Sequence, residues 1–363
     1  MFETLTAAPP DKILHLSVLY RNDPRPQKMD LGVGVYKDAA GDTVIMKAVR
    51  EAEKRLYDSQ KTKTYVGMAG DEGFNRAMLK LVFGEGADLS RMFACQTAGG
   101  SGALRTISDL IKKSKPDATV WLSDPTWANH HPILAAAHLK TAVYPYFDVA
   151  SGLVKFEAML DALKAAKPGD VVLLHGCCHN PTGANLTIEQ WGPLTDLLVE
   201  RGLFPFVDLA YQGFGDGLDE DAAPVRMLAG RVQEMAVATS CSKNFSVYRD
   251  RVGAVILMGK DAGSVEIAGG QALAITRVLY SMPPDHSAAA VRIVLEDAGL
   301  CADWKAELEG MRLRMLNLRK DFAEALRRQS NSARFDFIAD HRGMFSRLGI
   351  TEEQVNRLRD DFG

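Results

Sequence analysis

Short apolar runs alternate with segments of helical length from about residue 45 to residue 310, and this alternation constrains the fold more than any other feature of the chain. Strand, helix and strand repeated in this way indicate an α/β fold with a mainly parallel sheet and helices on both faces. We expect strands at Thr119–Leu122, Val171–His175, Phe204–Val207, Met235–Ala238 and Ala254–Met258. We expect helices at Phe156–Ala166, Ile188–Arg201 and Ala222–Val232.

The chain has 363 residues, which is more than one small hydrophobic core requires. We predict a large domain over residues 45–310 and a smaller α+β domain formed by residues 1–44 and 311–363. The charged segment Leu300–Arg328 carries Leu, Met and Trp at helical spacing. It therefore predicts a long helix, which we expect to join the two domains.

Composition and charge exclude several kinds of partner. The net charge is -3 and no run of Lys or Arg stands out, so we expect neither nucleic acid nor an anionic membrane as a partner. No apolar run approaches the length of a membrane span, and the first residues do not have the pattern of a secretion signal. An odd number of cysteines in apolar or glycine-rich surroundings favours reduced thiols in a cytoplasmic protein. These cysteines are Cys95, Cys177, Cys178, Cys241 and Cys301.

A lysine follows the apolar run Met235–Ala238 and is surrounded by small hydroxyl residues. The local sequence is Thr239-Ser-Cys-Ser-Lys243-Asn-Phe245. An ammonium group at the end of a buried strand must be paired, solvated or used chemically. A lysine that forms a Schiff base fits a hydroxyl-lined and partly desolvated strand end. The alternative is an ordinary surface lysine on a loop.

Asp208 directly follows the apolar run Phe204–Val207. A carboxylate in that position is costly unless a cation or a strong donor meets it. It could cap a helix, or it could pair with the protonated nitrogen of a pyridine ring. Tyr211 follows three residues later, so its phenol could donate a hydrogen bond in the same site.

The segment His175-Gly-Cys-Cys-His179-Asn180-Pro-Thr-Gly183 contains two histidines at helical spacing. That spacing could indicate a metal site, but the glycine and the following proline argue against a helix, and no nearby carboxylate completes a ligand set. We favour a turn that presents Asn180 as a hydrogen-bond donor.

A glycine-rich segment that leads into a helix, Thr97-Ala-Gly-Gly-Ser-Gly-Ala-Leu-Arg105, could bind a phosphate through free backbone N–H groups. The segment matches neither GxGxxG nor GxxxxGK[ST], which disfavours a dinucleotide or P-loop site. Arg251 offers a bidentate fork for a phosphate or carboxylate, or else forms an ordinary ion pair. A lysine, a carboxylate and a phosphate cradle, with an asparagine and a tyrosine for a phenolic oxygen, are the set that pyridoxal 5'-phosphate requires.

At this point the chain resembles the class I aminotransferases, specifically the aspartate/aromatic amino acid aminotransferase family of fold type I pyridoxal enzymes. The resemblance implies a seven-stranded sheet flanked by helices, and it covers nearly the whole chain. It rests on motifs at Leu31–Lys37, Thr64–Gly67, Pro125–His130, His175–Gly183, Asp208–Phe214 and Ser242–Phe245.

The resemblance implies a cofactor role for each matching residue. Lys243 would bind the cofactor aldehyde and then move a proton between the substrate and the cofactor. Asp208 would pair with the pyridine nitrogen, and Asn180 and Tyr211 would bond the ring oxygen. Trp127 would stack on the ring, with His130 behind it. The phosphate would be held by Gly99, Gly100, Ser101, Ser240 and Arg251.

The resemblance also implies that each active site is shared by two subunits of a homodimer. Tyr65, with Ser281 as a further candidate, would reach the phosphate in the neighbouring subunit. Arg277 would cross the interface to the distal carboxylate of an acidic substrate, and Gly34 would lie on a loop that closes over substrate. Trp127 and Asn180 would also touch the substrate.

Two departures from the family pattern stand out. Ser246 occupies a glycine position, which costs about 1 kcal/mol if the backbone φ there is positive. Family members also continue beyond residue 363, and their tail carries the arginine that grips the substrate α-carboxylate. We therefore expect a chain that binds the cofactor but transaminates weakly, unless the sequence is part of a longer protein.

The leading functional hypothesis is transfer of the amino group of aspartate or an aromatic L-amino acid to 2-oxoglutarate by a ping-pong mechanism. One alternative is a pyridoxal-phosphate lyase or decarboxylase, which would share the cofactor residues. The other is a weakly active or inactive pyridoxal-phosphate-binding paralogue. No metal is expected in the site.

Overall fold

The computed structural model describes residues 1–7, 12–32 and 34–363. Part of the N-terminal segment and Val33 of the motif at Leu31–Lys37 therefore lie outside the described residues. The chain divides into two compact units, which are Met1–Val35 with Leu348–Gly363 and Tyr36–Arg347. The domain boundaries expected from the sequence stay a prediction.

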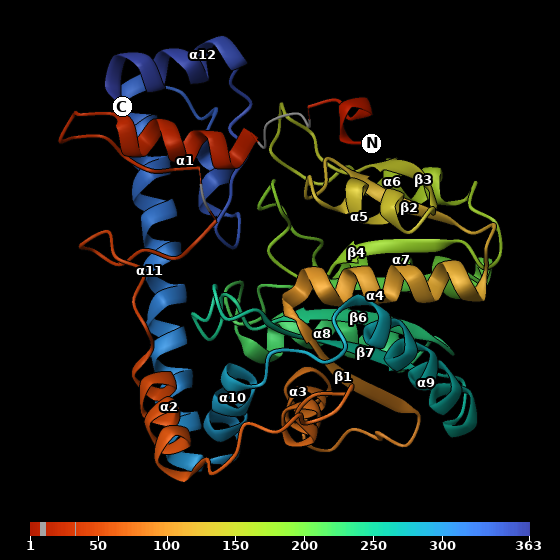
Figure 1. Ribbon diagram of the computed structural model, residues 1–363. Coiled ribbons are helices and arrows are strands. Elements are labelled where there is room, and N and C mark those ends of the chain that lie inside the picture. The colour runs from red at the N-terminus through yellow and green to blue at the C-terminus, as the bar shows by residue number, and fades with distance from the viewer. Residues whose placement is uncertain (8–11, 33) are drawn as a thin grey trace. The chain divides into compact units, whose positions relative to one another are not determined.

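The larger unit is built on one mixed seven-stranded sheet with the strand order β1-β7-β6-β5-β4-β2-β3 (Figure 1). All neighbouring strands are parallel except for β7, which is antiparallel to both β1 and β6. The sequence-based expectation of a mainly parallel seven-stranded sheet is confirmed. The strands are β1 (Met92–Ala98), β2 (Thr119–Asp124), β3 (Lys140–Pro145), β4 (Val171–His175), β5 (Phe204–Leu209), β6 (Met235–Ser240) and β7 (Val252–Met258).

Every expected strand is present, and four of the five are longer than expected by a few residues. The two strands that the sequence analysis did not predict are β1 and β3. The edge strand β3 is mostly exposed, so it has no continuous apolar run that would reveal it. The end of β1 contains the buried polar side chains Gln96 and Thr97. Both strands therefore lack the apolar pattern that marks the central strands.

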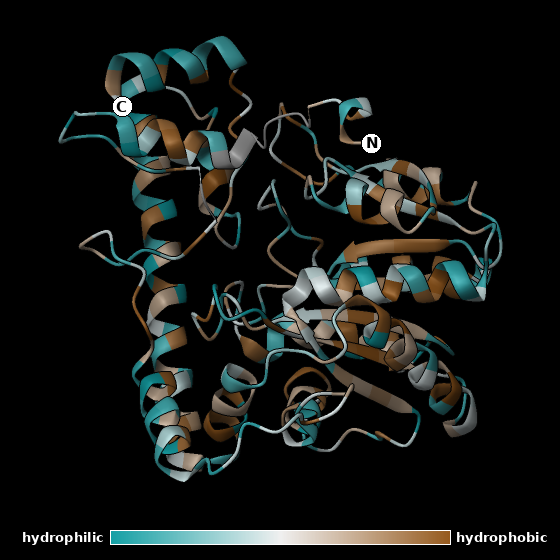
Figure 2. Cartoon of the chain, viewed as in Figure 1, coloured by the Kyte–Doolittle hydropathy of each residue, from teal (hydrophilic) through white to brown (hydrophobic). Residues whose placement is uncertain are grey.

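Helices cover both faces of the sheet (Figure 1), and the strands and the helices beside them are rich in hydrophobic residues (Figure 2). Buried apolar side chains form the core between these layers. One face packs against α4 (Gly99–Ser114), α5 (His130–Ala136) and α9 (Ala262–Leu279). The other packs against α6 (Phe156–Leu163), α7 (Ile188–Arg201) and α8 (Leu218–Ala229). All three predicted helices are present. The bounds of α7 agree with the prediction because a capping box of Thr187 and Gln190 begins the helix and the left-handed Gly202 ends it.

Four further helices of the larger unit pack beside the sheet and against one another. The longest is α11, whose bounds confirm the long helix expected at Leu300–Arg328. All of α11 lies within the larger unit. Trp304 on α11 is completely buried and reaches the lysine segment described below. The four helices are α2 (Lys47–Ser59), α3 (Glu72–Phe83), α10 (His286–Glu296) and α11 (Ala298–Ser330), and a short 3-10 turn, η2 (Asp336–Ala339), follows them.

The smaller unit contains α1 (Lys12–Asn22) and α12 (Glu352–Arg357), with short turns η1 (Phe2–Thr4) and η3 (Leu358–Phe362). Its two chain segments are joined by Arg25, which donates to the backbone oxygens of Arg359 at 2.8 Å and Asp360 at 2.9 Å. In the part of the chain that the structure describes, no helix is both long and apolar enough to cross a membrane.

Candidate active site

The polar sequences singled out above meet at one edge of the sheet. Strands β4, β5 and β6 are parallel, and His175 lies opposite Asp208 in their register. Because β1 and β6 are both antiparallel to β7, they run in the same direction. Gly99, which begins α4 after β1, therefore lies at the edge where β6 leads into the Lys243 segment. Ligands of such sheets bind beyond the carboxyl ends of the strands.

Lys243 lies in a short segment after β6 and is partly buried. Its Nζ atom is 4.7 Å from the centroid of the Tyr211 ring. Burial lowers the pKa of the Lys243 amine below its ordinary value and the positive charge of Arg251 adds to this, although Asp208 opposes it. A larger fraction of the amine is therefore neutral, which is the nucleophilic and basic form.

An aromatic pair fixes the segment that carries Lys243. The ring of Phe245 stacks on Trp304 with centroids 4.4 Å apart and an angle of 4° between the planes. The indole Nε1 of Trp304 donates a hydrogen bond of 2.7 Å to the backbone oxygen of Asn244. Sequence reasoning did not identify Trp304, because it lies on α11 and no local pattern connects it to the lysine.

Asp208 is buried, and its carboxylate oxygen Oδ2 lies 3.1 Å from Nε2 of His130. The other ring nitrogen of His130 lies 2.7 Å from the Thr126 hydroxyl. Burial alone would raise the pKa of Asp208, but the hydrogen bond and charge of His130 and the charge of Lys243 lower it below its ordinary value. The carboxylate therefore stays ionised although it is buried, and it is suited to hold a cationic partner.

His175 lies between two other histidine rings, with centroids 5.3 Å from His130 and 4.1 Å from His179. Burial lowers the pKa of His175 to about 3, so the ring is neutral at physiological pH. Both of its ring nitrogens are buried, and neither has a hydrogen-bond partner among the described residues. The sequence showed no carboxylate that would complete a ligand set with His175 and His179; for His175 this was wrong, because β5 brings Asp208 within 4.8 Å of His175 and of His130.

Asn180 and Tyr211 come from different loops and meet in the site, with Nδ2 of Asn180 3.4 Å from the hydroxyl oxygen of Tyr211. Burial raises the pKa of Tyr211, and the charge of Asp208 raises it further. The phenol therefore keeps its proton and can donate a hydrogen bond. The two side chains together form a donor pair for an anionic oxygen.

The beginning of α4 forms a cradle for an anion. The N-cap residue Ala98 makes no side-chain capping bond, so the first N–H groups of the helix are not satisfied by a cap. A Cβ atom on Gly99 would lie 2.5 Å from a guanidinium nitrogen of Arg251. A Cβ atom on Gly100 would lie 3.0 Å from Cβ of Ser240. Ser101 lies in the first turn of the same helix.

Two further residues border this group. Trp127 is half-buried and meets the His130 ring edge-on, with centroids 5.3 Å apart and an angle of 89°. Tyr248 accepts a hydrogen bond of 2.9 Å from the backbone N–H of Tyr36, and its backbone oxygen accepts one of 3.0 Å from Arg251. Sequence reasoning did not identify Tyr248, since the contact of its hydroxyl with Tyr36 joins residues that lie far apart in the chain.

Three expected site residues of the larger unit, Tyr65, Arg277 and Ser281, do not join the cluster around Lys243. Tyr65 is 91% exposed. Arg277 and Ser281 are exposed and form a hydrogen bond with each other. Gly34 belongs to the smaller unit. The roles expected for these four residues stay predictions.

The residues of the cluster fit pyridoxal phosphate group by group. The partly buried amine of Lys243 suits an aldehyde, and the ionised carboxylate of Asp208 suits a pyridinium. The uncapped start of α4, beside Arg251 and Ser240, suits a phosphate because glycines there admit a close approach.

Comparisons with known proteins identify the family. Residues 26–363 match the family model of class I and II aminotransferases. An aromatic-amino-acid aminotransferase of Paracoccus denitrificans is 50% identical over 363 residues, which cover 100% of this chain and 92% of that protein. An aspartate aminotransferase of Escherichia coli (strain K12) is 44% identical over 366 residues, with the same coverage.

A similar solved structure contains pyridoxal phosphate. An aromatic-amino-acid aminotransferase from Burkholderia pseudomallei, covalently bound to pyridoxal phosphate, is 38% identical with a TM-score of 0.98. It covers 100% of this chain, which in turn covers 92% of it.

The chain belongs to the class I and II aminotransferases. It is an aminotransferase that uses pyridoxal phosphate and acts on an amino acid and a 2-oxo acid. Neither a lyase nor an inactive paralogue is favoured by these relatives.

Proposed function

We propose that this enzyme transfers the amino group of aspartate or of an aromatic L-amino acid to 2-oxoglutarate by a ping-pong mechanism. The similar proteins named above divide between aromatic-amino-acid and aspartate aminotransferases, which supports both substrate classes. The observation that carries the proposal is the position of the Lys243 amine, which lies over the Tyr211 ring with its pKa lowered by burial.

In this proposal the cluster at the sheet edge holds the cofactor. Lys243 would bind it covalently, and Trp127 would lie against its ring. Asp208 would pair with the ring nitrogen, because its carboxylate stays ionised while buried. Asn180 and Tyr211 would donate to the ring oxygen. The phosphate would be held by Gly99, Gly100, Ser101, Ser240 and Arg251.

Bound pyridoxal phosphate supplies an electron sink for the pair of electrons left when the substrate Cα loses its proton. The Nζ atom of Lys243 takes that proton and returns it later in the half-reaction. A base with a lowered pKa carries out this transfer near neutral pH, since more of it is unprotonated. Tyr211 keeps its own proton and acts as a hydrogen-bond donor. Lys243 thus acts as the base, and Tyr211 acts as the hydrogen-bond donor.

Substrate selection is assigned to Arg277, together with Gly34, Trp127 and Asn180. The guanidinium of Arg277 is exposed in a single chain, and its hydrogen bond to Ser281 occupies only part of its donor set. It is therefore able to meet the distal carboxylate of a dicarboxylic substrate as a bidentate donor.

We also propose that the enzyme works as a homodimer in the cytoplasm. Tyr65 is an aromatic residue with 91% of its surface exposed, which a site built in one subunit does not explain. A second subunit that receives Tyr65 and Arg277 into its own active site would account for both. All five cysteines are unpaired, as in a reducing compartment.

Substrate-specific kinetics test the proposal. We expect Arg277→Leu to lower kcat/KM for aspartate by about 100-fold, because a bidentate charge pair contributes roughly 3 kcal/mol. The value for phenylalanine should change much less. Arg328→Leu, which removes a 71% exposed arginine from α11, is the control. Equal losses for both substrates, or no loss for aspartate, would contradict the assignment of Arg277.

A further inference from the structure

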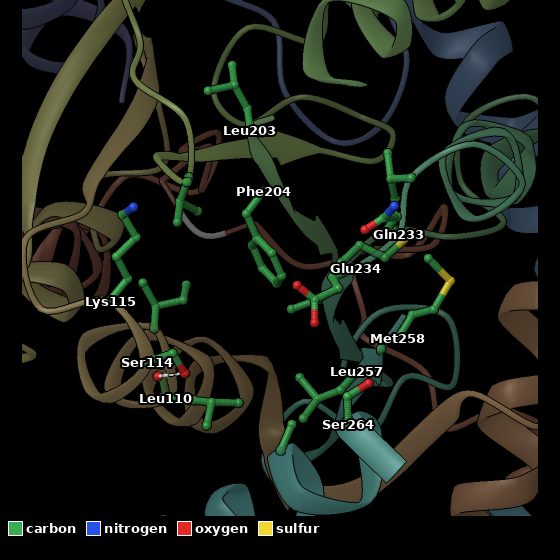
Figure 3. A pocket seen from close by; sticks show the side chains of 18 of the residues that line it. Leu110, Ser114, Lys115, Leu203, Phe204, Gln233, Glu234, Leu257, Met258 and Ser264 are labelled. Atoms are coloured by element: carbon green, nitrogen blue, oxygen red, sulfur yellow. Dashed lines mark hydrogen bonds between the residues drawn. The ribbon is translucent and has the colours of Figure 1, made fainter. Parts of the chain in front are cut away.

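A cavity of about 610 Å³ lies at the opposite end of the sheet from Lys243. Figure 3 shows side chains that line it. Its walls come from α4, α7 and α9, and its floor comes from the amino ends of β4, β5 and β6 with the carboxyl end of β7. Lys243 follows β6 while this cavity precedes it, so the strand Met235–Ser240 separates the two by roughly 20 Å. The cavity is therefore distinct from the active site. Most of its lining is apolar, including Leu110, Leu203, Phe204, Leu257 and Val265.

The register of the sheet places an aromatic ring beside a carboxylate in this cavity. Phe206 of β5 pairs with Ala236 of β6, and both side chains belong to the core under α4 and α9. Two residues earlier along the chain are Phe204, the first residue of β5, and Glu234, which immediately precedes β6. Figure 3 shows both side chains pointing into the cavity.

Glu234 is the acidic residue of the lining; it is exposed to solvent and has no ion pair or hydrogen bond among the described residues. Lys115 donates its Nζ to the backbone oxygen of Pro168 at 3.1 Å. Arg231 forms an ion pair with Asp196 outside the cavity lining. A neutral backbone oxygen leaves the charge of Lys115 uncompensated, so the lining keeps that positive charge and, on Glu234, a negative charge that is available to a cationic ligand.

We propose that this cavity binds an organic ammonium ion with an aromatic or branched apolar body. An ammonium group is attracted by a carboxylate and also by the face of an aromatic ring, so Glu234 and Phe204 favour the same kind of group. The apolar body would replace water against Leu110 and Leu257. The volume lies within the range of roughly 300–1,000 Å³ that small-molecule sites occupy.

Calorimetric titration of the holoenzyme with 2-phenylethylammonium chloride tests the proposal. We expect one saturable site per chain and about tenfold weaker binding by Glu234→Gln, which keeps the shape and removes the charge. The neutral analogue 2-phenylethanol should bind the parent enzyme about tenfold more weakly for the same reason. Glu234→Gln should leave turnover unchanged, because the residue lies at the far end of β6 from Lys243.

A second variant keeps the charge and removes the space. Ala268 on α9 lines the cavity and is half-buried, so Ala268→Phe would fill it while Glu234 remains. We expect this variant to lose binding of the probe and to keep its turnover. Absence of saturation below about 10 mM, or equal binding by the parent and both variants, would overturn the proposal. Inhibition competitive with the amino acid that persists in Glu234→Gln would place the probe in the active site and would also overturn it.

Discussion

The substitution Gly99→Ala tests the phosphate cradle at the beginning of α4. Gly99 has a backbone φ of +70°, and a Cβ atom there would lie 2.5 Å from one guanidinium nitrogen of Arg251 and 2.8 Å from its central carbon. Both distances are shorter than van der Waals contact, so Arg251 must move. The new methyl group would therefore act on the residue that we assign to the phosphate.

Two separate costs follow from this geometry. An alanine in the left-handed region costs roughly 1 kcal/mol of folding stability. Displacement of Arg251 removes charge-assisted hydrogen bonds to the phosphate, each worth about 1.5–3 kcal/mol. We therefore expect cofactor affinity to fall by about 10- to 100-fold, since 1.4 kcal/mol corresponds to a factor of ten.

Spectrophotometric titration of the cofactor-free protein with pyridoxal phosphate measures the affinity, and urea unfolding measures the stability. Gly102→Ala is the matched control, because it lies in the same first turn, has no positive φ and meets its nearest atoms only at 3.5 Å. If Gly99→Ala bound the cofactor as tightly as Gly102→Ala, the assignment of Arg251 to the phosphate would be refuted.

Three further predictions concern other parts of the site. Ser246 has a φ of +58°, and its hydroxyl donates a hydrogen bond of 2.8 Å to the backbone oxygen of Val44. Both Ser246→Gly and Ser246→Ala lose this bond, but only the alanine keeps the backbone strain, so the free energy of unfolding of Ser246→Gly should be about 0.5 to 1 kcal/mol higher. Equal denaturation midpoints of the two variants would contradict this. Asp208→Asn should slow the single-turnover half-reaction by about 10³-fold, because an ion pair at this depth contributes roughly 4 kcal/mol, and a loss below tenfold would argue against the role of Asp208. Burial lowers the pKa of Lys243 below its ordinary 10.5, so between the two pKa values the unfolded chain binds more protons and the cofactor-free protein gains stability as pH rises. Lys243→Met should remove that gain in urea titrations at alkaline pH, and an unchanged pH dependence would show that the amine is not desolvated.

A local sequence pattern was sufficient to predict the positive φ of Ser246. The family pattern has glycine there, and the structure confirms that the backbone φ is positive. The same is true of the long helix α11, whose apolar spacing indicated its bounds closely. In both cases the signal lies in residues that are adjacent along the chain.

The sequence by itself determined the central strands and the positions of Lys243 and Asp208. Asp208 directly follows its own apolar run, Lys243 follows Met235–Ala238 after four further residues, and parallel strands bring their carboxyl ends to one edge of the sheet. No long-range information was needed for that inference.

Only the tertiary structure decided which residues surround them. His130 meets Asp208 across 78 residues of sequence, and Trp304 reaches the Lys243 segment across 60. The cavity beside Glu234 likewise depends on three helices from distant parts of the chain. Side-chain pairing of this kind depends on how helices pack on the sheet, and packing is set by the whole core rather than by local spacing.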